Sequence, residues 1–188
     1  MLLPEGVIID GTTGAVTPET RHYTKRLSEL RGLFQDDHAF AEAMDREDAV
    51  VYEVAEYRKE NSDIFFGTTT MYPGKVGKEY YFTRGHFHQR RDMGEVYYAQ
   101  SGAGILLLES RDGRAEAVEM RPGVCAFIPP DWAHRTVNVG DDKFVFVWVC
   151  NPQAGHDYAD IQRKGMRLAV IEQGGRPAVV DNSKYLSS

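Results

Sequence analysis

The chain has 188 residues, 42% of them hydrophobic and 27% charged, a composition typical of a globular protein large enough to bury a core without disulfides. Its formal net charge of -6 argues against nucleic acid or an acidic membrane as the main partner, because such binding rests on basic patches. The sequence shows neither a signal-peptide pattern nor an apolar run of membrane-spanning length, and we therefore expect a cytoplasmic protein.

The first 48 residues are expected to form short elements of mixed type. The stretch GVIIDGTTGAV (residues 6–16) predicts a short strand with a glycine-rich turn, and Thr17 before Pro18 predicts a helix start. Tyr23, Leu27, Leu30 and Phe34 then recur at helical spacing, which predicts a helix. A second short helix is expected from about His38 to Met44.

From residue 49 onward the sequence predicts short strands separated by turns. The turns YPGK, RDGR, RPG and VGDD supply proline, glycine and aspartate where the backbone must reverse. Many short strands at this spacing indicate an all-β sandwich or barrel and not a parallel sheet with crossover helices. The expected strands are VVYEVAEY, IFFGTTTMY, KEYYFTRGHFH, EVYYAQ, GILLLES, AEAVEM, VCAFIP, TVNVG, KFVFVWV and RLAVIE.

We expect one domain over residues 1–188, since the chain shows no repeat or linker. It would comprise N-terminal elements (1–48), a barrel (49–172) and a C-terminal tail (173–188). Cys125 and Cys150 are the two cysteines and lie in the apolar stretches VCAF and FVWVC, which predicts buried thiols and no disulfide.

The stretch GHFHQRRDMGE contains a candidate metal-binding pair, His86 and His88. Side chains at i and i+2 point to the same face of a strand, so both imidazoles can reach one ion. Glu95 opens the next expected strand, and a hairpin would return its carboxylate beside the pair. His134 follows the Pro-Pro turn of PPDWAHRTVN and is the fourth candidate. Three imidazoles and one carboxylate suit iron, manganese, nickel, cobalt or zinc better than calcium or magnesium.

The order of these residues resembles the two motifs of the cupin family. In that order, the pair His86 and His88 is followed by Glu95 and Gly102, and later by Gly123, Pro129, His134 and Asn138. This resemblance implies a cupin double-stranded β-helix, a jelly-roll barrel. Two glycines that are usual in these motifs are replaced here by Tyr80 and Asp131, and the spacer between His88 and Glu95 is longer than in most cupins.

A narrower resemblance covers nearly the whole chain. The stretch TTTMYPGKVGKEYYFTRGHFH, followed by EVYYAQSGAG, PPDWAHRTVN and AGHDYADI, resembles the cupin-type phosphoglucose isomerases of archaea and some bacteria. The likeness extends to KRLSELRGLF, AVVYEV and AVVDN. It implies interconversion of glucose 6-phosphate and fructose 6-phosphate, a homodimer, and one divalent metal per subunit, with Fe²⁺ foremost and Mn²⁺, Ni²⁺, Co²⁺ or Zn²⁺ as alternatives. The N-terminal strand is a candidate to join a neighbouring subunit's sheet edge.

The isomerase resemblance also implies roles for single residues. The metal ligands would be His86, His88, Glu95 and His134, and the catalytic residues Glu95 and His134. Glu95 would act as the base that moves a proton between C1 and C2 through an enediolate. Because a carboxylate engaged by a metal is a weaker base than a free one, either Glu95 loosens from the metal or a hydride shift replaces proton transfer, and both alternatives stay open.

The substrate phosphate needs hydroxyls, backbone amides and basic groups, since the chain has no P-loop. By resemblance the phosphate-binding candidates are Tyr52, Thr69, Thr83 and Gly85, and the sugar would be lined by Tyr97, His156 and Tyr158. In a regular strand Thr83 and Gly85 would face away from His86 and His88, so we expect a bend at Gly85. Arg90 and Arg91 are interpreted as a solvated turn that could reach the pocket mouth.

Two other functional classes remain compatible with the motifs. A cupin dioxygenase also uses three histidines and a glutamate to hold ferrous iron, but it would leave PGKVG and the threonines unexplained. A non-catalytic sugar-binding cupin would have no need for all four ligands.

Overall fold

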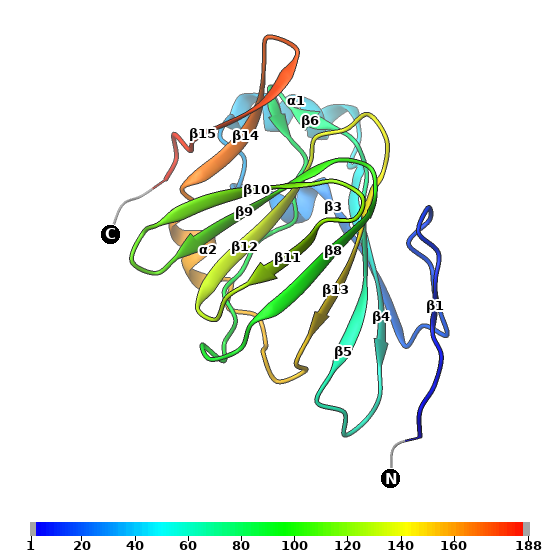
Figure 1. The fold of residues 1–188 in the computed structure, drawn as a ribbon. Coiled ribbons are helices and arrows are strands. Elements are labelled where there is room, and N and C mark those ends of the chain that lie inside the picture. The colour runs from blue at the N-terminus through cyan, green and yellow to red at the C-terminus, as the bar shows by residue number, and fades with distance from the viewer. Residues whose placement is uncertain (1–2, 186–188) are drawn as a thin grey trace.

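A six-stranded antiparallel sheet forms one wall of the molecule in the computed structural model, which describes residues 3–185 (Figure 1). Its strands lie in the order β11-β8-β13-β5-β4-β3. They are β3 (Arg21–Arg26), β4 (Val50–Arg58), β5 (Phe65–Met71), β8 (Glu95–Ser101), β11 (Cys125–Ile128) and β13 (Phe144–Cys150). Side chains alternate between the two faces of these strands, and the inward-facing Tyr97, Ala99 and Phe146 are buried.

The opposite wall is a three-stranded sheet in the order β10-β9-β12, which an irregular segment extends. Its strands are β9 (Gly104–Ser110), β10 (Ala115–Met120) and β12 (Trp132–Asn138). The segment 82–87 continues the sheet, because Phe82 and His86 form isolated bridges with Val137 and His134 of β12. The apolar core lies between the two walls and contains aromatic pairs such as Phe34 and Phe82, whose ring centroids are 4.3 Å apart.

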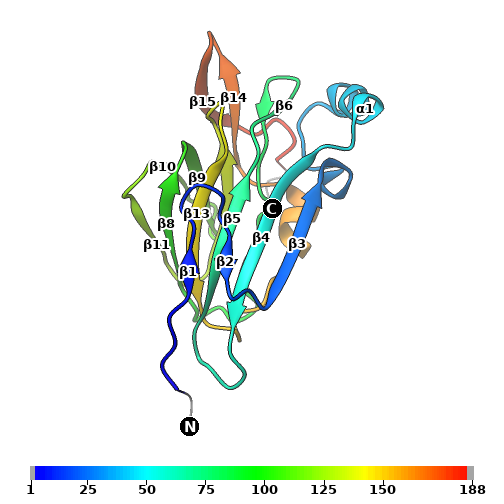
Figure 2. The same ribbon diagram turned by 90° about the vertical axis from the view of Figure 1, so that its right-hand side faces the viewer.

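A four-stranded sheet in the order β15-β14-β7-β6 and the helix α1 lie toward one end of the barrel (Figures 1 and 2). The sheet comprises β6 (Lys75–Val76), β7 (Glu79–Tyr80), β14 (Leu168–Gln173) and β15 (Arg176–Asp181), and the helices are α1 (Asp37–Arg46), α2 (Ala159–Lys164) and the 3₁₀ helix η1 (Leu27–Leu30). Neither α-helix has the length or the apolarity needed to cross a membrane, and no other α-helix occurs in residues 3–185.

An N-terminal hairpin of β1 (Ile8–Ile9) and β2 (Val16–Thr17) lies on the outer face of the six-stranded sheet (Figure 2). It is attached through threonines of β5. The Thr70 hydroxyl donates to the Thr13 carbonyl at 3.1 Å, and the Thr68 hydroxyl donates to the Gly14 carbonyl.

The predicted all-β barrel of the cupin type is confirmed by these facing antiparallel sheets. The second predicted helix is also confirmed as α1. It begins after Asp36, whose side chain accepts a hydrogen bond from the Ala39 amide at 2.9 Å. The range 173–188, expected to be a tail, contains the strand β15, which pairs with β14. Residues 1–2 and 186–188 of the expected terminal ranges lie outside the described chain.

Two predictions for the front of the chain are wrong. The segment from Tyr23 to Phe34 is not an α-helix, because β3 pairs with β4 and only the short η1 follows it. Leu27 and Leu30 are fully buried, and their spacing of three suits one turn of 3₁₀ helix as well as an α-helix. Thr17 does not start a helix either, but ends the strand β2.

The prediction of two buried cysteines is wrong for Cys125. Residues of β11 alternate between exposed and buried, and this alternation turns Cys125 and Phe127 to the outer face. Cys150 is half-buried, and both thiols are free.

Candidate metal centre

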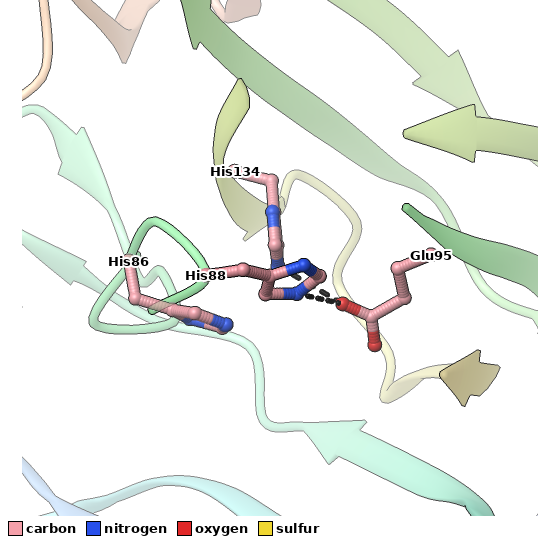
Figure 3. A group of neighbouring side chains, drawn as sticks. All are labelled: His86, His88, Glu95 and His134. Atoms are coloured by element: carbon pink, nitrogen blue, oxygen red, sulfur yellow. Dashed lines mark hydrogen bonds and ion pairs between the residues drawn. The ribbon is translucent and has the colours of Figure 1, made fainter. Parts of the chain in front are cut away.

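Four side chains from three segments meet between the walls of the barrel (Figure 3). One ligand atom of each lies within 4.8 Å of the ligand atoms of the others, and we call this group the histidine–glutamate cluster: His86, His88, Glu95 and His134. The backbone holds the two histidine segments together, because the amides and carbonyls of His86 and His134 exchange hydrogen bonds of 3.3 and 3.1 Å. Glu95 is the first residue of β8, but the predicted hairpin is wrong in its pairing, because the 82–87 segment bridges to β12 while β8 pairs with β11 and β13. The carboxylate therefore reaches the histidines from the opposite wall of the barrel.

The imidazoles of the cluster direct their Nε2 atoms toward its centre. His88 Nδ1 lies 2.9 Å from the Met93 carbonyl, and His134 Nδ1 lies 3.3 Å from the Trp132 carbonyl. A carbonyl can only accept, so each Nδ1 carries a proton, and in the neutral form of the ring Nε2 has the lone pair that a metal needs. Both Nε2 atoms lie 3.2 Å from Glu95 Oε2. Metal-binding histidines in proteins are commonly oriented by such a backbone carbonyl.

Buried nitrogens without partners indicate that the cluster is suited to a cation. Within the described chain, the buried Nε2 of His86 has no hydrogen-bond partner, and the buried Nε2 of His134 makes only the ion-pair contact of 3.2 Å with Glu95 Oε2. Such groups are costly to leave unsatisfied, and a metal ion would satisfy both. The residues present therefore fit the divalent metal that was expected from the sequence.

The charges of the cluster suit metal binding in the same way. Burial lowers the pKa of His86 well below its usual value, and the neighbouring histidines add to this effect. Burial alone would raise the pKa of Glu95, but contacts with His134 and His88 hold it at about 2. Burial opposes protonation of His88, yet the hydrogen bond with Glu95 raises its pKa. A metal therefore meets one carboxylate and at least one neutral imidazole, and it must displace any proton on His88.

A pocket opens beside the cluster and encloses about 620 Å³ of space, part of it open to solvent. All seven of the residues expected to bind substrate line it, as do three members of the cluster. The lining consists of Tyr23, Tyr52, Val54, Glu56, Phe65, Thr69, Thr83, Arg84, Gly85, His86, Glu95, Tyr97, His134, Phe146, Trp148, Cys150, His156 and Tyr158.

The register of the six-stranded sheet places the histidine–glutamate cluster and Thr69 of β5 at different positions along the strand direction. Cys150 of β13 pairs with Glu95, and Phe146 of the same strand pairs with Thr69. These two β13 residues are four positions apart, so Thr69 lies about 13 Å from Glu95 along the strand direction at roughly 3.3 Å per residue. The pocket is thus long enough to accommodate a ligand that carries different groups at its two ends.

The expected bend at Gly85 is present. Gly85 has φ +76°, and the chain from Phe82 to Phe87 forms only isolated bridges in place of a regular strand. Thr83 and Gly85 consequently line the same pocket as His86. The Thr83 hydroxyl accepts a hydrogen bond of 2.9 Å from the Thr136 amide, which fixes its position.

Sequence reasoning missed one basic residue of the pocket, Arg84. Its guanidinium lies over the Tyr158 ring, 4.4 Å from the centroid, and donates to Gln162 Oε1 at 3.0 Å. The available signal was its place between Thr83 and Gly85. Arg90 and Arg91, which were considered for the pocket mouth, instead pair with Asp92 and Asp131 and do not line the pocket. Tyr23 and Glu56 also line the pocket and were missed. Their strands, β3 and β4, lie far from the histidine motifs in the sequence, and only the folded sheet brings them to the pocket.

Comparison with known proteins gives a consistent result over almost the full length. Residues 24–186 match the family model described as glucose-6-phosphate isomerase (GPI). Curated relatives of that name include one from Thermococcus onnurineus, 48% identical over 97% of this chain and 96% of its own, and one from Pyrococcus horikoshii, 45% identical over 97% of both chains. A relative of the same name from Sinorhizobium medicae is 41% identical over 97% of this chain and 87% of its own.

One solved structure that is similar to this chain matches a smaller part of it. Oxalate decarboxylase from Bacillus subtilis superimposes with a TM-score of 0.46 and 21% identity, over 56% of this chain and 26% of that chain.

Proposed function

The chain belongs to the glucose-6-phosphate isomerase family, and we propose that its reaction, the interconversion of glucose 6-phosphate and fructose 6-phosphate, takes place in the pocket beside the histidine–glutamate cluster. The observation that carries this proposal is the lining of the pocket, which places four side chains that could hold a cation at one depth and threonine hydroxyls and a guanidinium elsewhere. A sugar phosphate isomerase needs an electrophile near the reacting carbons and hydrogen-bond donors for the phosphate, and these two groups of residues could supply them.

We assign the proton transfer to Glu95. Moving a carbonyl between C1 and C2 requires a base that takes a proton from one carbon and returns it to the other. The contacts of Glu95 with His88 and His134 both involve Oε2, and Figure 3 shows the other carboxylate oxygen directed away from these rings. Oε1 would then hold the migrating proton while Oε2 stays in the cluster, so that Glu95 need not leave its place.

A divalent metal bound in the cluster would supply electrophilic stabilisation of the negative charge that develops on the sugar oxygens. Its ligands would be the four side chains of the cluster. We propose Fe²⁺ as the resident ion, because a set of three imidazoles and one carboxylate suits it, while Mn²⁺, Ni²⁺, Co²⁺ and Zn²⁺ are competitors whose occupancy depends on supply. Elemental analysis of protein purified without added metal tests this assignment.

Two neutral groups beside the cluster would orient the sugar. Burial raises the pKa of Tyr97 well above its usual value, and the carboxylate of Glu95 adds to this effect, so the phenol keeps its proton as a donor. Burial lowers the pKa of His156, whose ring centroid lies 4.3 Å from that of His86. Tyr158 stacks on His156 at 5.6 Å and closes the same wall.

We propose that the phosphate binds among Tyr52, Thr69, Thr83, Gly85 and Arg84. The support is that all five line the pocket and that two threonine hydroxyls, a phenol, a backbone amide and a guanidinium together make a dianion site. Arg84 would then exchange its contact with Gln162 for a charge-assisted bond to phosphate.

The experiment that tests the proposal measures conversion of fructose 6-phosphate by the purified chain before and after removal of metal with EDTA. We expect isomerase activity that EDTA abolishes and added divalent metal restores. His88→Ala should lose metal and activity together, whereas His38→Ala, on the exposed face of α1, should change neither. A fully active, metal-depleted protein or an active His88→Ala variant would overturn the proposed site.

The alternative functions predict other outcomes in the same assay. Oxygen uptake without isomerisation would indicate a cupin dioxygenase, and binding without turnover a sugar-binding cupin. Running the reaction in deuterated water separates the two chemical routes, because product without solvent deuterium would count against the role of Glu95 as base.

We propose in addition that two copies associate through the outer face of the six-stranded sheet. Three large apolar side chains lie next to each other there: Phe127, Tyr98 and Val149 are 67%, 42% and 37% exposed. An exposed apolar patch of this kind commonly marks an interaction surface. Light scattering should show a dimer that Phe127→Asp dissociates, while Val179→Asp, at a separate exposed site on β15, leaves it intact.

A further inference from the structure

Arg111, in the turn directly after β9, contacts three carboxylates and one aromatic ring. Its guanidinium pairs with Asp131 at 2.8 Å, Asp160 at 3.1 Å and Asp157 at 3.7 Å. It also lies 4.0 Å above the centroid of Phe87, which is fully buried. Its side chain is only 27% exposed, so these contacts are partly shielded from water and salt.

Three of the four residues that Arg111 contacts, Phe87, Asp131 and Asp157, lie in different segments, and each segment lines the pocket or carries a residue of the histidine–glutamate cluster. Phe87 stands between His86 and His88, and Asp131 lies three residues before His134. Asp157 stands between His156 and Tyr158 and exchanges backbone hydrogen bonds of 3.0 and 2.8 Å with Phe87. One side chain therefore joins segments that are distant in sequence and converge on the cluster.

Two of the three departures from the usual cupin motifs, Asp131 and the longer spacer, meet at this network. Asp131 stands where a glycine is usual and has φ +64°, a conformation that aspartate tolerates better than most residues. Its carboxylate also accepts from Arg91 Nε at 2.9 Å, and Arg91 belongs to the unusually long spacer between His88 and Glu95. Asp131 and Arg91 of the longer spacer thus form an ion pair with each other.

We propose that Arg111 is a positioning residue for the metal centre. It fixes the segments of Phe87, Asp131 and Asp157 relative to one another and thereby sets the geometry in which the cluster binds a metal. The arginine is suited to this role because its planar fork bonds several carboxylates while its face stacks on a ring, which a lysine cannot reproduce. This inference rests on the proposed metal site.

The test uses Co²⁺ as a probe and measures its affinity by chelator competition and its visible absorption spectrum, which reports ligand geometry. Arg111→Leu should bind Co²⁺ about tenfold more weakly and with an altered spectrum, as is typical when an outer partner of a metal site is lost. Arg111→Lys should recover only part of the affinity. The matched control is Arg114→Leu, in the same turn, because among residues 3–185 the Arg114 side chain pairs only with the exposed Asp112, and its loss should leave both readouts unchanged.

A second variant keeps the inference testable if Arg111→Leu does not fold. Asp131→Asn preserves the tolerance for positive φ but weakens the link to Arg111, and it should show the same changes to a smaller extent. Affinity within twofold of wild type and an unaltered spectrum in every folded variant would overturn the role of Arg111. Failure of the wild-type protein to bind Co²⁺, or undiminished binding by His88→Ala, would overturn the metal site itself.

Discussion

Gly85→Ala is the substitution for which the structure gives the sharpest expectation. Gly85 has φ +76°, and an added Cβ would lie 3.2 Å from Cβ and Nε of Arg135 and 3.3 Å from the sulfur of Met166. Arg135 is fully buried and donates to the Arg84 carbonyl at 2.9 Å, so it cannot move away freely. We therefore expect the methyl to be accommodated by a shift of a few tenths of an ångström that involves the backbone next to His86.

The magnitude follows from two separate costs. A non-glycine residue in the left-handed region costs about 1–2 kcal/mol, and overpacking a well-filled site adds about 1–3 kcal/mol. Gly85→Ala should then lower the free energy of unfolding by about 2–5 kcal/mol. Gly175→Ala is the matched control, because Gly175 has nearly the same φ of +75° in the β14–β15 turn and an added Cβ there meets nothing within 4 Å. Gly175→Ala should cost only about 1–2 kcal/mol, for the left-handed conformation. Both variants replace glycine by alanine, so the loss of conformational entropy in the unfolded chain is the same and cancels when they are compared.

Urea unfolding of both variants in EDTA measures this difference without a contribution from metal binding. Steady-state kinetics of the metal-loaded proteins should show a large loss of kcat/KM for Gly85→Ala and none for Gly175→Ala. Equal destabilisation of the two would refute the contact with Arg135. Unchanged kinetics for Gly85→Ala would refute the view that the bend positions the pocket.

The remaining predictions concern binding, buried charge and pH. Thr83→Ala should raise KM for fructose 6-phosphate more than it lowers kcat, with Thr83→Ser restoring most of the loss; initial-rate kinetics that show a pure kcat defect would contradict phosphate binding. Lys164→Met breaks the buried pair with Glu109 and should cost about 3–5 kcal/mol in urea unfolding, against about 0–1 kcal/mol for Lys184→Met at an exposed pair; similar values would argue against burial as the cause. In the metal-free protein, the pKa of Glu95 is about 2 against 4.5 for the free carboxyl, so its stabilising contribution is complete above pH 4.5 and is lost as the pH falls toward 2. Glu95→Gln should flatten the pH dependence of stability in that window, and an unchanged slope would show that other groups cause it.

Much of the fold and the cluster could be predicted because the decisive signals are local. The spacing of His86 and His88 is a short-range pattern, and the side chains do meet Glu95 as predicted. The hairpin expected to bring Glu95 there is not formed, since β8 pairs with β11 and β13 and the histidine segment with β12. The position of His134 depended on pairing with a segment 48 residues earlier, and the motif resemblance supplied that link where periodicity could not.

The errors arose for two reasons. One spacing of apolar residues fits both an α-helix and a 3₁₀ turn, and the burial of a strand residue depends on strands that are distant in the sequence. Leu27 and Leu30 satisfy an α-helix and a 3₁₀ turn equally, and only the pairing of β3 with β4 decides between them. Cys125 lies in an apolar run, yet the face it occupies is set by the register with Tyr98, which the sequence of its own strand does not reveal.

The two ends of the pocket are built by different means, and this has a functional consequence. The end at the histidine–glutamate cluster depends on backbone pairing between the segments of His86 and His134, together with the first residue of β8, so small shifts there alter the distances among donor atoms. The other end depends on side chains that project from β4 and β5, such as Tyr52 and Thr69, whose strands are held by a continuous ladder of pairs. Substitutions at that end leave the cluster intact and should weaken substrate binding, whereas disturbances of the bend at Gly85 affect both ends at once, because the bend joins Thr83 to His86.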